Sequence, residues 1–377
     1  MGGLLAGEVS AVGGVVRDAL LGRPPGDELD LVVEGDAIAL AQRIGRELGA
    51  RVVAHPRFGT ASIELPHGGH VDLVSARTET YARPGALPTV GPGTLLDDLA
   101  RRDFTVNAMA LRLAGTERGE LVDPHGGVGD LEAGVLRALR PGAFAEDPSR
   151  IVRAARYAAR LDMTPADDTA AAAAAVAPGL DPSSARVAEE LRRLLDEPSA
   201  AGALERLTDM GVDWVLSGAG PAMERIDAAR AHPLGPDLPG WALRLGVAVA
   251  PGVVARAALP GWAKGVAAEV AGGPGVARRI AAADSPSAVD RLLRVTPPAA
   301  AVAALALGAD RVRDWWEGDR SRGAEVSGAD LMRAGVAPGP AIGRALEEVR
   351  AAVLDGRVGG REQQLELALR VARGAGA

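Results

Sequence analysis

The sequence contains no cysteine, a single lysine and no long hydrophobic run. Without cysteine the chain can form no disulfide framework, no thiolate-ligated zinc or iron–sulfur site, and no thiol nucleophile. The longest apolar stretches, residues 170–178 and 298–309, are shorter than the ~20 residues that a membrane-spanning helix needs. The N-terminal residues 1–16 carry Glu8 and no basic cluster, which is not typical of a secretory signal. We therefore expect a cytoplasmic protein.

The charge balance is acidic. The 377 residues include 49 acidic and 42 basic side chains, a formal charge of −7, and every basic residue except Lys264 is an arginine. The length is enough for two or three domains, and a hydrophobic fraction of 47% is that of a globular protein. An acidic total argues against a generally basic surface but leaves room for a local basic groove that binds nucleic acid.

Aromatic residues divide the chain into two parts. All phenylalanines and tyrosines lie between residues 58 and 157, and all five tryptophans lie after residue 210. The first part predicts an α/β sheet with some antiparallel pairing, and from residue 131 onward the pattern is helical. A stretch rich in proline and glycine, residues 81–93, predicts a long mobile loop. Strands are expected at residues 8–12, 29–33, 51–54, 61–65 and 70–74, and helices at 15–21, 37–48, 146–161, 185–195 and 200–210.

A glycine pair, Gly13 and Gly14, follows the first expected strand and precedes a helix that carries Arg17. Glycine lets a backbone approach a phosphate closely, and the start of a helix offers free N–H groups and a positive dipole end. The pattern is that of a phosphate-binding turn. A tight strand–helix turn with no ligand gives the same pattern.

Two carboxylates occur near the start of the second expected strand. Side chains two apart on a strand share a face, so Glu28 and Asp30 can converge on one divalent cation, whereas Asp27 cannot join them. Asp72 is a possible third acid on a neighbouring strand. Mg²⁺ prefers oxygen ligands and substrate phosphates. The alternative is a pair of solvated carboxylates without a metal.

Arginines recur along the helix expected at residues 146–161. Arg150, Arg153, Arg156 and Arg160 are spaced by three, three and four residues, which gives a loose stripe on one face. Guanidinium groups suit phosphates and the edges of bases. The alternative is an amphipathic helix whose arginines pair with acids.

Taken in this order, the motifs resemble the class II tRNA nucleotidyltransferase/poly(A) polymerase family over about residues 8–215. The resemblance continues through five further segments, at residues 72–81, 99–108, 123–127 with 130–131, 144–150 and 153–157, with a weaker match at 186–191. The second of these contains Arg-Arg-Asp-Phe-Thr at residues 101–105, and the fourth contains Glu-Asp-Pro-Ser-Arg at residues 146–150.

The resemblance implies a polymerase-β-like nucleotidyltransferase head over residues 1–135 and a helical neck with a nucleotide-recognition helix over residues 136–215. A helical body and tail that bind tRNA would occupy residues 216–377. The implied activity is template-independent addition of CMP and AMP, from CTP and ATP, to the tRNA 3′ end. This phosphoryl transfer would depend on two Mg²⁺ ions and release pyrophosphate.

The family's functional residues can be transferred position by position. The catalytic metal ligands would be Glu28 and Asp30. Gly13, Gly14 and Arg17 would hold the triphosphate, and Arg102 would contact the nucleotide or its phosphates. Asp147 and Arg150 would read the edge of the incoming base, while Arg153 and Arg156 would contact the nucleotide.

One position departs from the family. Its first metal-binding acid is normally Asp, and here Glu28 adds one methylene, which would lower activity because Mg²⁺ demands near-ideal octahedral geometry. The other motifs are intact, so an active enzyme is favoured. Addition of A alone, of CC alone, or of poly(A) stays open, since the segment at residues 84–90 does not decide. A catalytically weakened RNA-binding relative and a small-molecule nucleotidyltransferase are alternatives, although the latter class lacks the two arginine-containing segments. The oligomeric state stays open.

Overall fold

The computed structural model describes residues 8–24, 26, 28–66, 68–80, 89–140, 142–216, 218–232 and 237–374, without the side chains of Glu28, Glu79 and Thr80. The chain forms two compact units. The first is Met1–Asp181 with Glu197–Asp213, and the second is Pro182–Asp196 with Trp214–Ala377. The division at residues 135 and 215 stays a prediction. Within the described ranges, no helix combines the length and the apolar character needed to cross a membrane.

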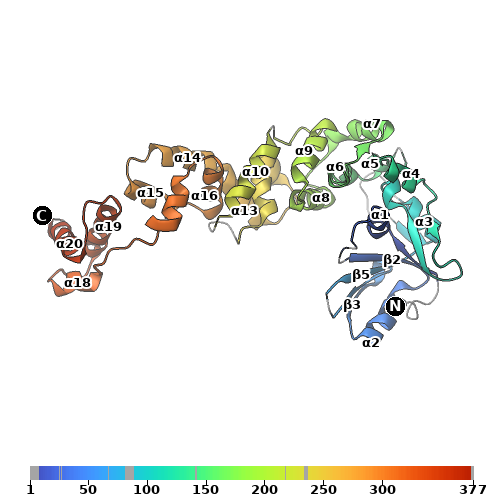
Figure 1. Ribbon diagram of the computed structural model, residues 1–377, viewed down its shortest axis with the longest axis horizontal. Coiled ribbons are helices and arrows are strands. Elements are labelled where there is room, and N and C mark those ends of the chain that lie inside the picture. Colours follow the sequence, from blue (N-terminus) through green and yellow to red (C-terminus); the bar gives the residue numbers. More distant parts are fainter. Residues whose placement is uncertain are drawn as a thin grey trace. The chain divides into compact units, whose positions relative to one another are not determined.

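A seven-stranded sheet organises the first unit, with strand order β3-β4-β5-β2-β1-β8-β9. Figure 1 shows β2 beside β5 in this sheet. β2 and β5 are parallel, and the other neighbouring pairs are antiparallel. The predicted mixed sheet and its strands are confirmed. The strands are β1 Glu8–Val12, β2 Glu28–Glu34, β3 Arg51–His55, β4 Thr60–Glu64, β5 His70–Ser75, β8 Ala110–Ala114 and β9 Leu121–Val122.

Three helices attach to this sheet. α1 (Gly14–Leu20) follows β1 directly, and α2 (Ala37–Leu48) packs on β3, β4 and β5. α3 (Leu95–Ala100) starts in a capping box and buries Leu95 and Leu99 against Val12 and Val32. The face of β1 and β2 that carries Val12 and Val32 is therefore partly covered by α3.

The expectation of a loop over residues 81–93 is wrong at its C-terminal end. Thr89–Pro92 forms β7, which pairs antiparallel with β6 (Arg77–Thr80). The proline and glycine residues of this stretch indicated a loop. The strand depends on its pairing with β6, which lies before residues 81–88 and which no local pattern indicates. Residues 81–88 lie outside the described residues.

Two further expectations need correction. The chain after residue 131 is not purely helical, since β10 (Val135–Leu136) pairs in parallel with β11 (Thr164–Pro165). The helix expected at residues 146–161 is divided into α5 (Ala143–Glu146) and α6 (Ser149–Leu161). Pro148 disfavours a helical conformation of the residue before it, and Asp147 is extended at φ −140° and ψ 94°.

The remaining helices of the first unit are α4 Gly127–Glu132, α7 Asp167–Val176 and α9 Ala200–Asp209, with short 3₁₀ helices η1 Pro56–Phe58, η2 Thr105–Asn107 and η3 Ala177–Gly179. The second unit is helical, as expected. Its helices are α8 Ala185–Asp196, α10 Ala219–Arg230, α11 Gly240–Ala248, α12 Pro251–Arg256, α13 Gly261–Ala271, α14 Gly273–Ala282, α15 Pro286–Leu293, α16 Pro298–Ala306, α17 Arg311–Asp314, the π-helix η4 Trp315–Asp319, α18 Gly328–Arg333, α19 Pro340–Leu354 and α20 Arg361–Gly374.

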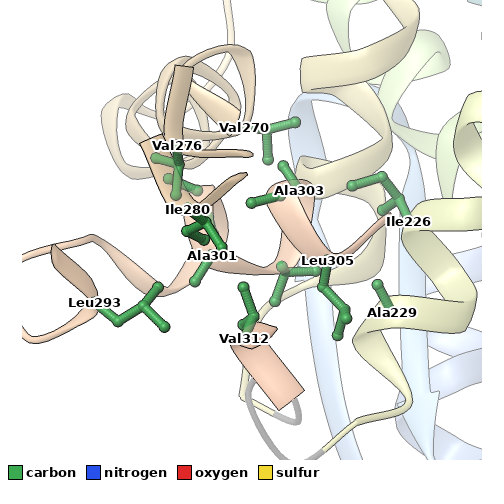
Figure 2. Packing of buried hydrophobic residues seen from close by; sticks show 14 of the residues in the cluster. Ile226, Ala229, Val270, Val276, Ile280, Leu293, Ala301, Ala303, Leu305 and Val312 are labelled. Atoms are coloured by element: carbon green, nitrogen blue, oxygen red, sulfur yellow. The ribbon is translucent and has the colours of Figure 1, made fainter. Parts of the chain in front are cut away.

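Helix α16 lies at the centre of the main core of the second unit. Its residues 299–305 are all buried, and five of these seven residues are alanine. Figure 2 shows α16 side chains among residues of α10, α13 and α14. A Cβ atom built on Gly273 of α14 would lie 2.5 Å from the Cβ of Ala303. Small residues thus let these helices pack closely.

A partly buried ion pair joins three parts of the second unit. Asp290 of α15 accepts hydrogen bonds from Arg350 of α19 (Nε at 2.8 Å, Nη2 at 2.7 Å) and from the indole Nε1 of Trp315 in η4 (2.8 Å). Burial raises the pKa of the Asp290 carboxyl, but the bonds from Arg350 and Trp315 outweigh it and hold the pKa below its ordinary value.

Candidate active site

The turn between β1 and α1 requires glycine. Gly13 has φ 71° and ψ −127°, a conformation that residues with a side chain rarely adopt, and its N–H donates to the carbonyl of Met109 (3.2 Å). A Cβ atom at Gly13 would lie 2.7 Å from Nη1 of Arg102. The missing side chain therefore makes room for a guanidinium, and two of the predicted site residues lie in contact.

Gly13→Ala is expected to destabilise the first unit by about 2–3 kcal/mol. Alanine would be strained in this backbone conformation, and its Cβ atom would also displace Arg102. Gly22→Ala is the matched control, since Gly22 has φ 65° and no atom within 4 Å of a built Cβ. The control is expected to cost about 1 kcal/mol. Hydrogen exchange of the β1 and β2 amides measures both variants. Equal losses in the two would show that the contact with Arg102 carries no cost.

The predicted acids lie at the same edge of the sheet as this turn. Ala11 of β1 pairs with Leu31 of β2, so Val12 and Asp30, the next residues along each strand, come opposite one another. Asp30 is exposed and precedes Val32 by two residues, so it lies on the face that α3 partly covers further along. Glu28 opens β2, and its side chain is outside the described atoms.

Asp72 is in register with Asp30 across the parallel pair of β2 and β5. Its Oδ1 accepts a hydrogen bond from Ser62 Oγ (2.5 Å) and lies 2.9 Å from Nε2 of His70. Among the described residues, no group of three or more metal-binding side chains occurs. Mg²⁺ commonly binds through one or two carboxylates and takes its other ligands from water and phosphates. Two acids two residues apart on β2, Glu28 and Asp30, fit that pattern.

The buried carboxylate of Asp98 holds the two consecutive arginines of the 101–105 segment. Oδ1 of Asp98 accepts from Nε (3.0 Å) and Nη2 (2.5 Å) of Arg101, and Oδ2 accepts from Nη2 of Arg102 (3.1 Å). Asp98 is fully buried on α3, while each arginine side chain is 19% exposed. The orientation of Arg102 is thus fixed from a rigid helix.

A chain of hydrogen bonds runs from α1 to α6. Arg17 donates through Nη1 to Oδ1 of Asn107 (2.6 Å), and Nδ2 of Asn107 donates to Oδ1 of Asp103 (3.2 Å). Oδ2 of Asp103 accepts from Nη1 of Arg153 (3.0 Å). Burial raises the pKa of Asp103, but the Arg153 charge and hydrogen bond, with a further bond from Asn107, lower it more, so the pKa falls below its ordinary value.

Arg17 lies beneath the glycine turn. Its side chain is only 2% exposed, and its Nε and Nη2 both lie 2.9 Å from Oδ1 of Asp18. A Cβ atom built on Gly14 would be 3.5 Å from Nη2 of Arg17. The positive charge therefore reaches the turn from the protein interior.

The predicted base-reading residues lie at the junction of α5 and α6. Oδ1 of Asp147 accepts from the backbone N–H (3.1 Å) and the hydroxyl (2.6 Å) of Ser149, the first residue of α6. Arg150 donates to the carbonyls of Ala143 (3.2 Å) and Arg101 (3.4 Å). The junction and the 101–105 segment are therefore in direct contact.

Every arginine of the stripe lies close to an acid. Arg156 Nη1 is 2.8 Å from Glu197, and its guanidinium lies over the Tyr157 ring at 4.7 Å. Arg150 and Arg160 lie within 4 Å of Glu146 and Asp18, respectively. Together with the Arg153–Asp103 pair, these contacts match the alternative in which the arginines pair with acids.

Asp98, Asp103 and Asn107 belong to this site, and sequence reasoning assigned a role to none of them. Asp98 precedes Arg101 by three residues and Arg102 by four, a spacing that indicates helical side-chain pairs. Asn107 belongs to the matched segment at residues 99–108, but no sequence signal indicated that its amide meets Arg17.

Residues 9–137 match the family model described as the poly(A) polymerase head domain. The CC-adding tRNA nucleotidyltransferase of Deinococcus radiodurans is 37% identical over 370 residues, which cover 98% of this chain and 90% of that protein. The chain belongs to the tRNA nucleotidyltransferase family. The resemblance seen in the sequence is thereby confirmed.

Two other proteins define the likeness further. The A-adding tRNA nucleotidyltransferase of Halalkalibacterium halodurans is 42% identical over 212 residues, which cover 55% of the chain described here. The chain spans about half of the length of that relative, since the match covers 49% of it. The structure of the Thermotoga maritima CCA-adding enzyme complexed with tRNA has a TM-score of 0.74 and 26% identity, covering 96% of this chain and 91% of that one. The predicted head with a helical remainder is confirmed.

Proposed function

We propose that this tRNA nucleotidyltransferase adds CMP and AMP, from CTP and ATP, to the 3′ end of tRNA without a nucleic-acid template. One observation carries the proposal: the Gly13 turn approaches the Arg102 guanidinium, and it directly follows Val12, which lies opposite Asp30 on the neighbouring strand. The names of the relatives, which add CC, A or CCA to tRNA, support the same substrates. The proposal places the reaction in the cytoplasm, where these substrates occur together.

In this proposal Glu28 and Asp30 would hold Mg²⁺, which would lower the pKa of the attacking 3′-hydroxyl and stabilise the leaving pyrophosphate. The 3′-oxygen attacks the α-phosphorus in line, and the bond from that phosphorus to the bridging oxygen breaks. Gly13 and Gly14 let the backbone approach the triphosphate. Arg102 contacts the triphosphate beside the turn, and Arg17 supplies positive charge from beneath it. The catalytic effect is mainly positioning and charge neutralisation.

The base would be selected at the junction of α5 and α6. Asp147 and Arg150 present donors and acceptors there, and Arg153 and Arg156 follow on α6. Of these three arginines Arg153 is the most exposed, at 30% of its side chain against 6% for Arg150 and 9% for Arg156. Arg153 is therefore the readiest to meet an entering nucleotide.

Two products of the reaction are candidates, the complete CCA end and CC alone. Full CCA addition is the proposal that the family resemblance favours. Addition of CC alone is the second candidate, because the relative matched along 98% of this chain is a CC-adding enzyme. The tRNA would be held by shape and phosphate contacts in the helical second unit.

The test incubates the purified chain and Mg²⁺ with three tRNA transcripts, which end before the CCA, after the first C and after CC. CTP, ATP or both are supplied, and the products are sequenced. Extension of all three transcripts to CCA is expected. Products that stop at CC support the second candidate. A complete lack of incorporation, with Mg²⁺ and again with Mn²⁺, would contradict the proposed activity and favour a catalytically weakened RNA-binding relative.

A further inference from the structure

A pocket of about 380 Å³ lies beside the π-helix η4 in the second unit. Leu293 and Ala301, both labelled in Figure 2, line it together with Trp316 and Arg320. Trp316 is partly buried against the main core of this unit, and Arg320 is exposed. A π-helix is rare and frequently occurs at a functional site. The side chains that η4 brings to this pocket are therefore candidates for a function.

The backbone that carries Trp316 and Arg320 is held firmly at the end of η4. Arg350, whose guanidinium is bound by Asp290, donates through Nη2 to the carbonyls of Asp319 (3.2 Å) and Arg320 (3.3 Å). Carbonyls at the C-terminal end of a helix have no partner within the helix, so these bonds satisfy them. Trp316 and Arg320 are thus presented to the pocket on a fixed backbone.

The guanidinium of Arg320 lies over the ring of Trp316, with its central carbon 3.9 Å from the ring centroid. A stacked guanidinium keeps the N–H groups at its edge available for other acceptors. Two other arginines line the pocket: Arg294 lies 2.9 Å from Glu347, and Arg350 is engaged as described above. Within the described part of the chain, no carboxylate forms an ion pair with Arg320. Its charge is therefore available to an anionic group that reaches the pocket.

We propose that this pocket binds one unpaired nucleobase of the tRNA. The base stacks on the Trp316–Arg320 pair, and an adjacent phosphate accepts hydrogen bonds from the edge of the Arg320 guanidinium. Aromatic rings and guanidinium planes are the surfaces on which unpaired RNA bases stack, and arginine forks suit phosphate oxygens. The inference rests on the proposed function, in which tRNA is the substrate, and adds to it a subsite in the second unit. Since stacking tolerates any base, the contact would serve tRNAs of different sequence alike.

Trp316→Leu removes the stacking surface. The Kd for a labelled tRNA transcript that lacks its 3′ end, measured by fluorescence anisotropy without CTP or ATP, should rise about tenfold. The KM for tRNA should rise to a similar degree, while the KM for CTP stays within about twofold of the wild type. Trp316→Phe keeps an aromatic ring and should stay within about threefold of the wild-type Kd. Trp262→Leu is the matched control, because Trp262 is 53% exposed and does not line the pocket.

Tryptophan fluorescence gives a signature that support of the fold alone would not produce. A base stacked beside Trp316 should quench its emission, so saturating tRNA should quench the wild type more than Trp316→Phe. A blunt RNA duplex offers phosphates but no unpaired base. We expect it to bind the wild type and Trp316→Leu with Kd values within about twofold of each other. Melting curves of all variants show that each measurement is made on folded protein.

Arg320→Gln tests the phosphate contact. The slope of log Kd for tRNA against log salt concentration should become shallower by about 0.7 to 0.9, the change expected for the loss of one phosphate contact. Arg322→Gln makes the same charge change two residues further on. Arg322 is 62% exposed and lies 3.5 Å from Asp319, so its loss should leave the slope as in the wild type.

The outcomes distinguish the subsite from the proposed function. If Trp316→Leu binds tRNA as tightly as Trp262→Leu does, or if Trp316→Phe is quenched as much as the wild type, the subsite is overturned. The pocket would then be left to a protein partner, and an active wild type would keep the proposed function standing. A wild type that binds tRNA with the expected quenching but incorporates no nucleotide would overturn the proposed function and leave the subsite in place.

Discussion

Asp30→Asn is expected to slow nucleotide addition by about 100- to 1000-fold, the loss seen when a preorganised charge-stabilising group is removed. Asp30 is exposed on β2, opposite the strand residue that precedes the Gly13 turn, and a neutral amide is a poor ligand for Mg²⁺. The melting temperature should hardly change, because Asp30 is exposed. Initial rates with CTP and a tRNA that lacks its 3′ end measure the effect.

Asp72→Asn is the matched control for this experiment. It makes the same charge change at the position in register on β5, where the carboxylate already accepts from Ser62 and lies against His70. We expect a smaller loss, about tenfold or less. Equal losses in Asp30→Asn and Asp72→Asn would make Asp72 a third metal ligand, and an unchanged rate in Asp30→Asn would contradict the assigned role. Glu28→Asp in the same assay shows whether the extra methylene costs rate.

Asp290→Ala is expected to destabilise the second unit by about 2–3 kcal/mol, because it leaves the charge of Arg350 without its principal partner. Complete burial of both charges would give a larger loss of stability, but 19% of the Arg350 side chain is exposed to water. All five tryptophans lie in this unit, so their fluorescence during urea unfolding follows the second unit and not the head. A shift in the midpoint at constant slope measures the loss of stability.

Glu347→Ala provides the control. Glu347 pairs with Arg294 and is 56% exposed, so its removal should cost less than about 1 kcal/mol. The pH dependence gives a second check. The folded pKa of Asp290 is below its unfolded value, so its contribution is present above the unfolded pKa and is lost as the pH falls below it. In Asp290→Ala the unfolding free energy should fall less steeply in acid than in the wild type, and equal slopes would contradict the role given to this carboxylate.

Most elements were predictable because they have a local cause. Residues 37–48 have helical periodicity, and the structure adds a cap from Asp36 and an end at Gly49 with φ 62°. The elements that were missed depend on partners elsewhere in the chain. β7 exists because β6 pairs with it, and β10 because β11 does. The break in the helix at Asp147 has a local cause, Pro148. The helical spacing of the arginines nevertheless favoured one continuous helix.

The candidate site was also predictable in part. Spacing and resemblance located Gly13, Asp30 and Arg102, and the structure brings all three to one edge of the sheet. The hydrogen bonds that hold the arginines were not predictable, because their acceptors come from separate segments. Asn107 meets Arg17 across 90 positions of sequence. The arginine stripe at residues 150–160 also offers less available positive charge than its spacing indicated, since each of its arginines lies close to an acid.

The close packing in the second unit limits how its sequence can change. Gly273 lies against Ala303, and a Cβ atom on Gly246 of α11 would lie 2.6 Å from Val270 of α13. At such positions nearly every substitution adds volume that the neighbouring helix cannot accept. Sequence drift at Gly246 and Gly273 is therefore restricted, because even the Cβ atom of alanine would lie 2.6 Å and 2.5 Å, respectively, from a neighbouring side chain. Divergence of this part of the chain will accumulate on outward-facing positions, while the spacing between its helices is inherited unchanged.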